Sequence, residues 1–322
     1  MKIRAAILDE MGRPGPYAQS RPVAIETIEL DAPGPGEVLV KITAAGLCHS
    51  DLSIINGDRP RVMPMVLGHE AAGVVEECGP GVTDLKRGDS VALVFVPSCG
   101  HCVPCMEGRP ALCEPGAASN TAGTLLGGAR RISLDGKPIY HHIGVSAFAE
   151  YAVVSRRSVV KIDPALPFDQ AALFGCAVLT GVGAVINTAS VRPGQSVAVI
   201  GLGGVGLSSV LGAIAAGAKD VIAVDLSDQK LGLARQLGAT LTFNAGDADC
   251  IEKVKAATKG GVDVAIEMAG SVRAFETAYR ITRRGGQTVT AGLPNPAHTF
   301  PLPIVNLVGE ERTIRVSTAE KR

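Results

Sequence analysis

Large aromatic side chains are nearly missing from this sequence of 322 residues. Tryptophan is absent, and only 4 tyrosines and 7 phenylalanines occur beside 39 glycines. The interior must therefore be assembled from small and branched aliphatic side chains, with tight turns and close backbone approaches at glycine. A sizeable interior is available nevertheless, because a chain of this length is typical of roughly two domains.

The chain also lacks an excess of charge, since 31 basic residues balance 31 acidic ones. No block of basic residues stands out, so we expect no nucleic-acid partner. No unbroken apolar run is long enough to span a bilayer, so we expect no membrane partner. The opening segment MKIRAAILDE is too short and too charged for a secretory signal, which favours a cytoplasmic protein.

The first half of the chain has the pattern of short strands. Residues 38–42, 71–77 and 90–94 are apolar runs of strand length, and turns rich in glycine and proline separate them. Short strands divided by such turns predict a small β-rich domain, either a barrel or a sandwich.

After about residue 163 the pattern changes to an alternation of helices and strands. Residues 171–190 have helical spacing and small side chains. Apolar strand patterns, with helical patterns between them, then follow at residues 196–200, 221–225, 240–243, 263–267 and 287–291. This alternation predicts an α/β domain with a parallel sheet and crossover helices.

A glycine-rich turn, GLGGVG at residues 201–206, links the first of these strands to a helix that runs to about residue 218. It fits the pattern G-x-G-x-x-G. Gly201 would permit the tight turn, Gly203 would let the backbone approach a pyrophosphate, and Gly206 would let helix and strand pack closely. The alternative is a glycine turn that holds no ligand.

An acidic residue, Asp225, ends the next strand about twenty residues beyond the last glycine. Its carboxylate would accept hydrogen bonds from the hydroxyls of a ribose and would repel a 2′-phosphate. The combination of turn and carboxylate therefore favours NAD over NADP. The alternative for Asp225 is a role as the N-cap of the following helix.

Half of the 8 cysteines lie in one short loop with the spacing C-x2-C-x2-C-x7-C. They are Cys99, Cys102, Cys105 and Cys113. Four thiolates can close a tetrahedron around Zn²⁺ and leave no position for water, which predicts a structural zinc. Disulfides, an iron–sulfur cluster or free thiols are the alternatives. We interpret His101, inside the loop, as a solvated neighbour rather than a ligand.

A second set of reactive residues is dispersed along the chain. It comprises Cys48-His49-Ser50-Asp51, Gly68-His69-Glu70 and Gly175-Cys176. Taken singly, none of these motifs is specific, because a lone cysteine is more often a small buried apolar side chain.

Taken together and in this order, the motifs resemble those of the zinc-dependent medium-chain alcohol dehydrogenase family. The resemblance rests on GHE at residues 68–70, the four-cysteine loop, GC at 175–176 and GLGGVG at 201–206, and it runs from residue 38 to about 314. It implies a β-rich GroES-like catalytic domain with a structural zinc lobe at residues 1–175. It also implies a Rossmann domain with a doubly wound parallel sheet at residues 176–322, and an active site in the cleft between the two.

The resemblance implies that Cys48, His69 and Cys176 bind a catalytic zinc, so that each chain carries two zinc ions. Three protein ligands leave a fourth position for an alcohol or water. Asp51 would orient His69 through its other ring nitrogen, and Glu70 would lie beside the ligands. Polyol dehydrogenases of the superfamily carry a carboxylate in place of Cys176, so the cysteine favours an alcohol dehydrogenase.

The implied reaction passes a hydride from an alcohol to NAD. Ser50 would take the alcohol proton, and Phe95 would line the substrate pocket. The further residues implied to contact NAD are His49 at the pyrophosphate, Gly204 in the turn, Thr180 and Val205 behind the nicotinamide, Lys230 at the ribose and Arg273 over the adenine. For Lys230 and Arg273 the alternative is a solvated helix face.

Two features depart from the family pattern. Ser53 stands where many members carry a histidine that continues the proton path, so we expect the proton to leave through ribose hydroxyls and water. Family chains also continue for several tens of residues beyond residues 313–317, which look like the last Rossmann strand. We therefore expect a C-terminally shortened protein with exposed apolar surface, reduced stability and doubtful activity.

The substrate we expect is a primary or aromatic alcohol or the corresponding aldehyde. One alternative is S-(hydroxymethyl)glutathione, for which Arg59 or Arg61 would help to hold a carboxylate. Another is an inactive relative that binds zinc or nucleotide without turnover. Residues 116–144 resemble the lobe of dimeric family members, whose dimer surface uses strands near residues 302–308 and 314–316. We therefore expect a homodimer.

Overall fold

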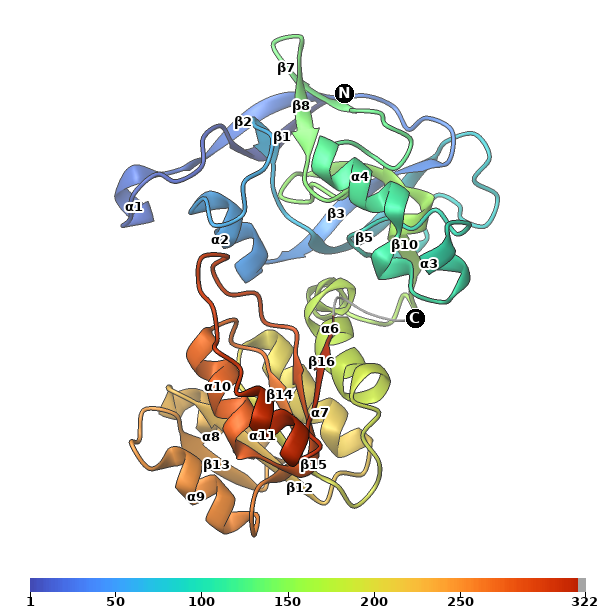
Figure 1. Ribbon diagram of the computed structural model, residues 1–322. Coiled ribbons are helices and arrows are strands. Elements are labelled where there is room, and N and C mark those ends of the chain that lie inside the picture. Colours follow the sequence, from blue (N-terminus) through green and yellow to red (C-terminus); the bar gives the residue numbers. More distant parts are fainter. Residues whose placement is uncertain (318–322) are drawn as a thin grey trace. The chain divides into compact units, whose positions relative to one another are not determined.

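The computed structural model describes residues 1–317, and its chain divides into two compact units. Residues 1–176 form the first unit, and the second begins at Ala177 (Figure 1). The sequence places the boundary one residue earlier, before Cys176. The difference arises because the Cys176 side chain packs against Cys48, which belongs to the first unit.

The first unit contains a closed barrel, with the strand order β1-β2-β7-β8-β4, and a five-stranded sheet, with the order β10-β6-β5-β3-β9. The strands are β1 (Lys2–Leu8), β2 (Val23–Leu30), β3 (Glu37–Gly46), β4 (Met65–Val66), β5 (Glu70–Cys78), β6 (Ser90–Leu93), β7 (Ile132–Leu134), β8 (Lys137–His141), β9 (Tyr151–Ser155) and β10 (Val159–Lys161). The β-rich first domain predicted from the sequence is confirmed.

Strand β3 contributes to two cores because successive side chains of a strand point to opposite faces. Val38 and Val40 pack with Val75 in one cluster of buried residues. Leu39, which lies between them in the sequence, packs with Ile7 in another cluster. The beginning of β3 is thus fixed on both faces, and the strand then leads to the reactive residues that begin at Cys48.

Short helices connect the strands of the first unit. They are α1 (Tyr17–Ser20), α2 (His49–Ile55), α3 (Val103–Met106), η1 (Pro110–Leu112), α4 (Glu114–Ala122), η2 (Arg156–Ser158), α5 (Phe168–Ala171) and η3 (Ala172–Gly175). Helix α3 lies within the four-cysteine loop, and helix α4 follows it directly (Figure 1).

The second unit is built on a six-stranded sheet in the order β13-β12-β11-β14-β15-β16, and every adjacent pair is parallel. Its elements are α6 (Ala177–Gly183), η4 (Ala184–Thr188), β11 (Ser196–Ile200), α7 (Gly204–Ala215), β12 (Asp220–Asp225), α8 (Asp228–Gln236), β13 (Leu241–Asn244), α9 (Cys250–Ala257), β14 (Val262–Glu267), α10 (Val272–Ile281), β15 (Thr282–Thr290), α11 (Ile304–Gly309) and β16 (Thr313–Val316). The predicted parallel sheet with crossover helices is confirmed.

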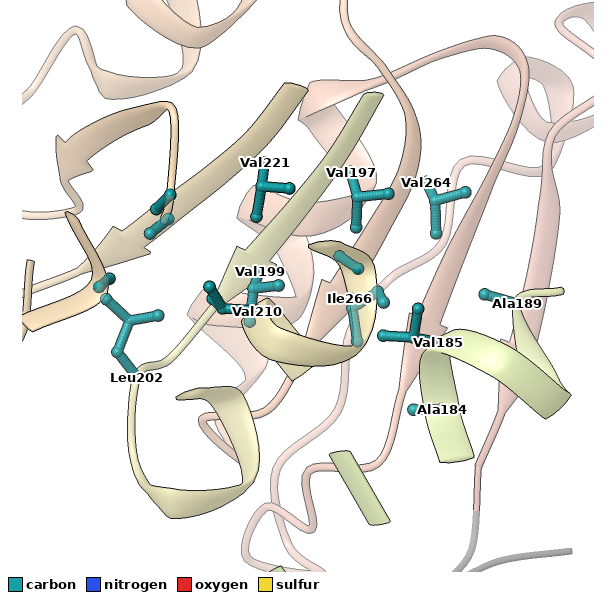
Figure 2. Packing of buried hydrophobic residues seen from close by; sticks show 14 of the residues in the cluster. Ala184, Val185, Ala189, Val197, Val199, Leu202, Val210, Val221, Val264 and Ile266 are labelled. Carbon is teal, nitrogen blue, oxygen red and sulfur yellow. The ribbon is translucent and has the colours of Figure 1, made fainter. Parts of the chain in front are cut away.

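Both faces of this sheet are buried, as a doubly wound fold requires. Val197 and Val199 of β11 pack with Val185 and Val210 on one face (Figure 2). Ala198 and Ile200, the alternating residues of the same strand, belong to a separate cluster on the other face. Small aliphatic side chains thus fill the space that large aromatic ones occupy in other proteins.

The prediction of a strand near residues 302–308 is wrong, because this segment contains helix α11. Its short apolar run does not distinguish a strand from a helix. Pro303 stands at the N-cap, and the Leu307 N–H bonds the Pro303 carbonyl at 3.1 Å. The predicted strand near residues 314–316 is present as β16, whereas residues 318–322 lie outside the described part of the chain.

The helical stretch predicted at residues 171–190 is divided at Cys176, whose φ of −140° and ψ of −72° are not helical. Within residues 1–317, no single helix is long and apolar enough to cross a membrane. By length and composition alone, a bent pair of shorter helices, residues 168–175 and 177–188, meets that criterion together.

Candidate metal centres and nucleotide-binding turn

The first ligand candidate, Cys48, stands immediately before helix α2. The chain turns there, and Asp51 lies in the first turn of the helix. The Cys48 N–H donates to Oδ2 of Asp51 at 3.3 Å, while the Asp51 N–H bonds the Cys48 carbonyl at 3.1 Å. These local contacts hold the thiol and the carboxylate at fixed positions relative to each other.

The second ligand candidate, His69, lies between β4 and β5 and has an exposed fraction of only 1%. The preceding Gly68 has a φ of +92°, and a Cβ atom there would lie 2.5 Å from the Phe148 backbone nitrogen. Only glycine fits this position. The close passage of these two chain segments therefore turns His69 inwards.

The side chains of Cys48, His69, Glu70 and Cys176 converge. One potential ligand atom from each lies within 4.8 Å of every other, and the two sulfur atoms are 4.0 Å apart. Two thiolates bound tetrahedrally to one zinc at about 2.3 Å would be about 3.8 Å apart. Sulfur, nitrogen and spacing thus fit a zinc ion without rearrangement.

His69 has one ring nitrogen available for that ion. Its Nδ1 lies 3.2 Å from Oδ1 of Asp51 and donates to the carboxylate. In the neutral imidazole Nε2 is then the unprotonated nitrogen, and this is the form in which His69 would bind a metal. The predicted orienting role of Asp51 agrees with this contact.

The charges of the cluster reinforce one another. The thiol of Cys176 donates to Cys48, and together with the neighbouring His69 it lowers the pKa of the Cys48 thiol well below its usual range. Although burial opposes it, hydrogen bonds with Asp51 and Cys48 raise the pKa of His69 to about 10. The site therefore stabilises thiolate at Cys48 even without a metal.

The sequence analysis places Glu70 beside the metal ligands, but in the structure its carboxylate belongs to the converging group itself. Burial and the Cys48 thiolate raise the pKa of its carboxyl to about 7. Its carboxylate is one of the converging groups, so Glu70 would offer a metal at this site a further oxygen ligand.

The sequence analysis missed His142, which is 1% exposed. Its Nδ1 lies 3.2 Å from Oδ1 of Asp51, and its ring meets that of His69 edge-on with centroids 5.4 Å apart. Within residues 1–317 this Nδ1 has no well-aligned hydrogen-bond partner. The histidine doublet at residues 141–142 was the visible signal, but its spacing matches no ligand motif.

The four cysteines of the loop form a second cluster, in which the ligand atoms again lie within 4.8 Å of one another. The Cys99 N–H donates to Cys113 Sγ at 3.1 Å, and the Gly116 N–H donates to the same sulfur at 3.3 Å. Backbone hydrogen bonds from His101 and Cys102 lower the pKa of the Cys99 thiol to about 6. Burial instead raises the pKa of the Cys113 thiol to about 12. The spacing of the four sulfur atoms suits a tetrahedral metal.

All eight cysteines are free, so the disulfide alternative is not supported. Nδ1 of His101 lies 3.0 Å from the Cys99 carbonyl oxygen. His101 is not among the converging ligand groups.

The glycine-rich turn of the second unit has the tight geometry that its sequence predicts. A Cβ atom on Gly206 would lie 1.8 Å from the Gly201 carbonyl oxygen, so the first and last glycines permit a contact that no other residue allows. A Cβ atom on Gly203 would meet nothing within 4 Å. The N-terminus of α7 is therefore open to a ligand such as a phosphate.

Asp225 is attached to this turn. Its Oδ2 accepts the Leu202 N–H at 2.7 Å, and its Oδ1 accepts the Ser227 N–H at 2.9 Å. The N-cap of α8 is Ser227, so the alternative N-cap role for Asp225 is wrong. The side chain of Lys230 is half-exposed, and its Nζ lies 4.0 Å from Oδ2 of Asp225. This position is compatible both with a contact to the ribose and with a solvated helix face.

The remaining predicted residues divide between the two units. In the first, Phe95 lies beside the metal ligands, with its ring centroid 5.3 Å from that of His69. His49 is exposed, Ser50 is half-buried and Ser53 is buried, its hydroxyl donating to the His49 carbonyl at 2.9 Å. In the second, Thr180 and Val205 are half-buried and Arg273 is exposed.

Comparisons with known proteins agree with this geometry. Residues 34–164 match the family described as alcohol dehydrogenase GroES-like domain, and residues 204–321 match that described as zinc-binding dehydrogenase. An S-(hydroxymethyl)glutathione dehydrogenase of Synechocystis is 43% identical over 297 residues, which are 91% of this chain and 78% of that relative. The chain belongs to the zinc-dependent medium-chain alcohol dehydrogenase family.

Other relatives include one with the same name and two with different names. An Escherichia coli S-(hydroxymethyl)glutathione dehydrogenase is 42% identical over the same shares of both chains. The benzyl alcohol dehydrogenase of Acinetobacter calcoaceticus has a TM-score of 0.91 and 32% identity, covering 100% of this chain and 85% of that one. A Sinorhizobium meliloti zinc-binding dehydrogenase bound to NADP has a TM-score of 0.79 and 28% identity over the same shares.

Proposed function

We propose that this protein oxidises a primary or aromatic alcohol to its aldehyde with transfer of a hydride to NAD. The observation that carries the proposal is the convergence of Cys48, His69 and Cys176 on one point, with sulfur atoms 4.0 Å apart. Three ligands of these types leave one coordination position for substrate, which distinguishes a catalytic site from a closed structural one. The four-cysteine loop would hold a structural zinc.

Zinc bound at the three-ligand site supplies a Lewis acid that polarises the alcohol oxygen and lowers its pKa. The chain's own residues orient that chemistry. Asp51 holds the tautomer of His69, and Phe95 stands beside the ligands as an apolar wall. Ser50, two residues after Cys48, takes the alcohol proton.

The cofactor preference rests on Asp225. Its carboxylate is fixed by the Leu202 and Ser227 N–H groups and retains lone pairs for the ribose hydroxyls of NAD. A 2′-phosphate beside this carboxylate would be repelled. We therefore propose NAD, although one related structure is bound to NADP.

A second candidate substrate is S-(hydroxymethyl)glutathione. It is favoured by the names of the relatives that are 42% and 43% identical. The benzyl alcohol dehydrogenase with a TM-score of 0.91 favours the aromatic alcohol instead.

The test is turnover by the full, zinc-loaded chain with benzyl alcohol, ethanol or S-(hydroxymethyl)glutathione, followed by the absorbance of the reduced cofactor. We expect benzyl alcohol to be oxidised faster with NAD than with NADP.

Ser50→Ala should lower kcat by about 100-fold or more, as expected for loss of a proton acceptor. Ser133→Ala, in the lobe, is the matched control. Zinc and nucleotide binding without turnover of any alcohol would instead indicate an inactive relative.

A further inference from the structure

Three neighbouring strands of the second unit, β12, β11 and β14, are parallel and therefore end at the same edge of the sheet. Strand β11 ends at Ile200, just before the glycine-rich turn, while β12 ends at Asp225 and β14 ends at Glu267. In an open parallel sheet, ligands bind outside the carboxyl ends of the strands. A carboxylate thus stands on each side of the strand that carries the turn.

Glu267 is buried and holds the backbone that follows it. The residue is 1% exposed. Its Oε1 accepts the Ala269 N–H at 2.8 Å and the Gly270 N–H at 2.6 Å, and its Oε2 accepts the Thr290 hydroxyl at 2.6 Å. Among residues 1–317 it forms no ion pair, so these hydrogen bonds stabilise the carboxylate in the interior.

The segment that Glu267 holds packs directly against the glycine-rich turn. The Met268 N–H bonds the carbonyl of Ile200 at 2.8 Å. A Cβ atom on Gly201 would lie 2.6 Å from the backbone nitrogen of Ala269. The position of this segment therefore limits where the turn can lie, while Asp225 holds the turn from the other side.

A third chain segment closes on the same carboxylate. Thr290, which donates to it, is the last residue of β15. Two residues later, a Cβ atom on Gly292 would lie 2.5 Å from Oε2 of Glu267. Only glycine allows so close a passage. Glu267 thus joins the ends of β11, β14 and β15 at the edge of the sheet where a dinucleotide would bind.

We propose that Glu267 is a positioning residue for the nucleotide. Its buried carboxylate acts through the backbone, by holding the glycine-rich turn and the segment beside it in the geometry that binds NAD. The inference rests on the proposed use of NAD and adds to it a residue that the glycine pattern does not contain. A pre-formed site avoids the cost of ordering the backbone on binding, so loss of the carboxylate should weaken nucleotide affinity.

Fluorescence titration of NADH with the zinc-loaded full chain measures this affinity, and the chain has no tryptophan whose emission would overlap the signal. We expect Glu267→Gln to raise the dissociation constant by about 10-fold, because an amide offers one acceptor oxygen in place of two and its hydrogen bonds carry no charge. Thr290→Val should raise it by about 3-fold, and Thr290→Ser, which keeps the hydroxyl, should restore the wild-type value.

Asp263→Asn is the matched control, because Asp263 is the other carboxylate of β14. It lies near the opposite end of the strand, where it accepts the Ser196 N–H at 2.7 Å. We expect this variant to lose stability in urea and to keep the wild-type dissociation constant for NADH. A purely structural Glu267 would behave in the same way, and that result would overturn the proposal. If Glu267→Gln fails to fold, equal dissociation constants in Thr290→Val and Thr290→Ser would overturn it instead.

Turnover of benzyl alcohol separates this inference from the proposed function. We expect Glu267→Gln to raise the KM for NAD by about 10-fold without lowering kcat, since binding is lost and the chemistry is not. If the wild type binds NADH and oxidises no alcohol, the proposed function fails, while a weaker affinity in Glu267→Gln still supports the positioning role. Equal dissociation constants in the wild type and Glu267→Gln contradict that role, whatever the turnover.

Discussion

The carboxylate of Asp51 contacts more groups than the one histidine that the sequence predicts for it. Oδ1 accepts the Gly68 N–H at 3.2 Å, and Oδ2 accepts the Cys48 N–H at 3.3 Å. Nδ1 of His69 and Nδ1 of His142 each lie 3.2 Å from Oδ1. Although burial opposes it, these imidazoles lower the pKa of Asp51 well below its usual range. One ionised carboxylate thus organises a ligand, a second histidine and two backbone segments.

Removal of this carboxylate should weaken the three-ligand site. We expect Asp51→Ala to lower zinc affinity by about 10-fold to 100-fold, because His69 loses the partner that fixes its tautomer and orientation. His142→Phe, which keeps an aromatic ring, should lower it in the same direction by a smaller factor. Competition with a chelator measures the affinity, and His101→Ala is the control. Unchanged affinity in Asp51→Ala would contradict the orienting role.

At the scale of single residues, the sequence predicts the candidate metal ligands but not the side chains that pack around them. Cys48, His69 and Cys176 stand in short motifs that the family resemblance makes recognisable. His142 is 93 residues after His49 and shares no motif with it, and only the packing of the lobe segment brings it to Asp51. The role of Glu267 is likewise a property of the fold, which no spacing reveals.

Secondary structure was easiest to predict where an apolar run stood next to a clear turn signal. The run at β11 is short and apolar, and the glycine turn that follows it favours a strand; its side chains divide between two buried clusters. The short run at α11 has no clear period, and its Pro303 N-cap decides in favour of a helix. The break at Cys176 depends on packing rather than on local preference, so it was missed.

Strands β11, β14 and β15 are joined by the carboxylate of Asp263. Its Oδ2 accepts the Ser196 N–H at 2.7 Å and the Ser196 hydroxyl at 2.8 Å, and its Oδ1 accepts Nε of Arg283 at 2.8 Å. Although burial opposes it, these partners lower the pKa of Asp263. One side chain therefore fixes the same end of three neighbouring strands.

This link should make stability depend on pH. Because the folded-state pKa of Asp263 is lowered, its contribution is present above the unfolded value of about 3.9 and disappears as the pH falls through the folded value. We expect Asp263→Asn to lower the free energy of unfolding by about 1–3 kcal/mol at pH 7 and by less at about pH 3. Urea unfolding at both pH values measures this. An equal loss at both would show that the charge is unimportant.

At the scale of the whole molecule, each unit has its own buried clusters, and β16 forms one edge of the six-stranded sheet. Apolar side chains are exposed on and beside this edge. Val305 is 84% exposed, Val308 71% and Val316 70%. An edge strand next to exposed apolar side chains favours association with another chain.

We therefore expect a homodimer formed through α11 and β16. Val305→Glu places a charge on the most exposed of these positions and should shift the molecular mass measured by sedimentation equilibrium from dimer towards monomer. Ile25→Glu, on exposed β2 of the first unit, is the matched control. A wild-type protein that sediments as a monomer would contradict the expectation.

The zinc content of Cys176→Ala, measured by mass spectrometry of the purified full chain, tests the account most directly. We expect about two zinc ions per chain in the wild type and in the control Cys78→Ala, one for each cluster of ligands. Cys176→Ala should retain only the ion of the four-cysteine loop. Two ions in Cys176→Ala would contradict the assignment of Cys48, His69 and Cys176 to one metal.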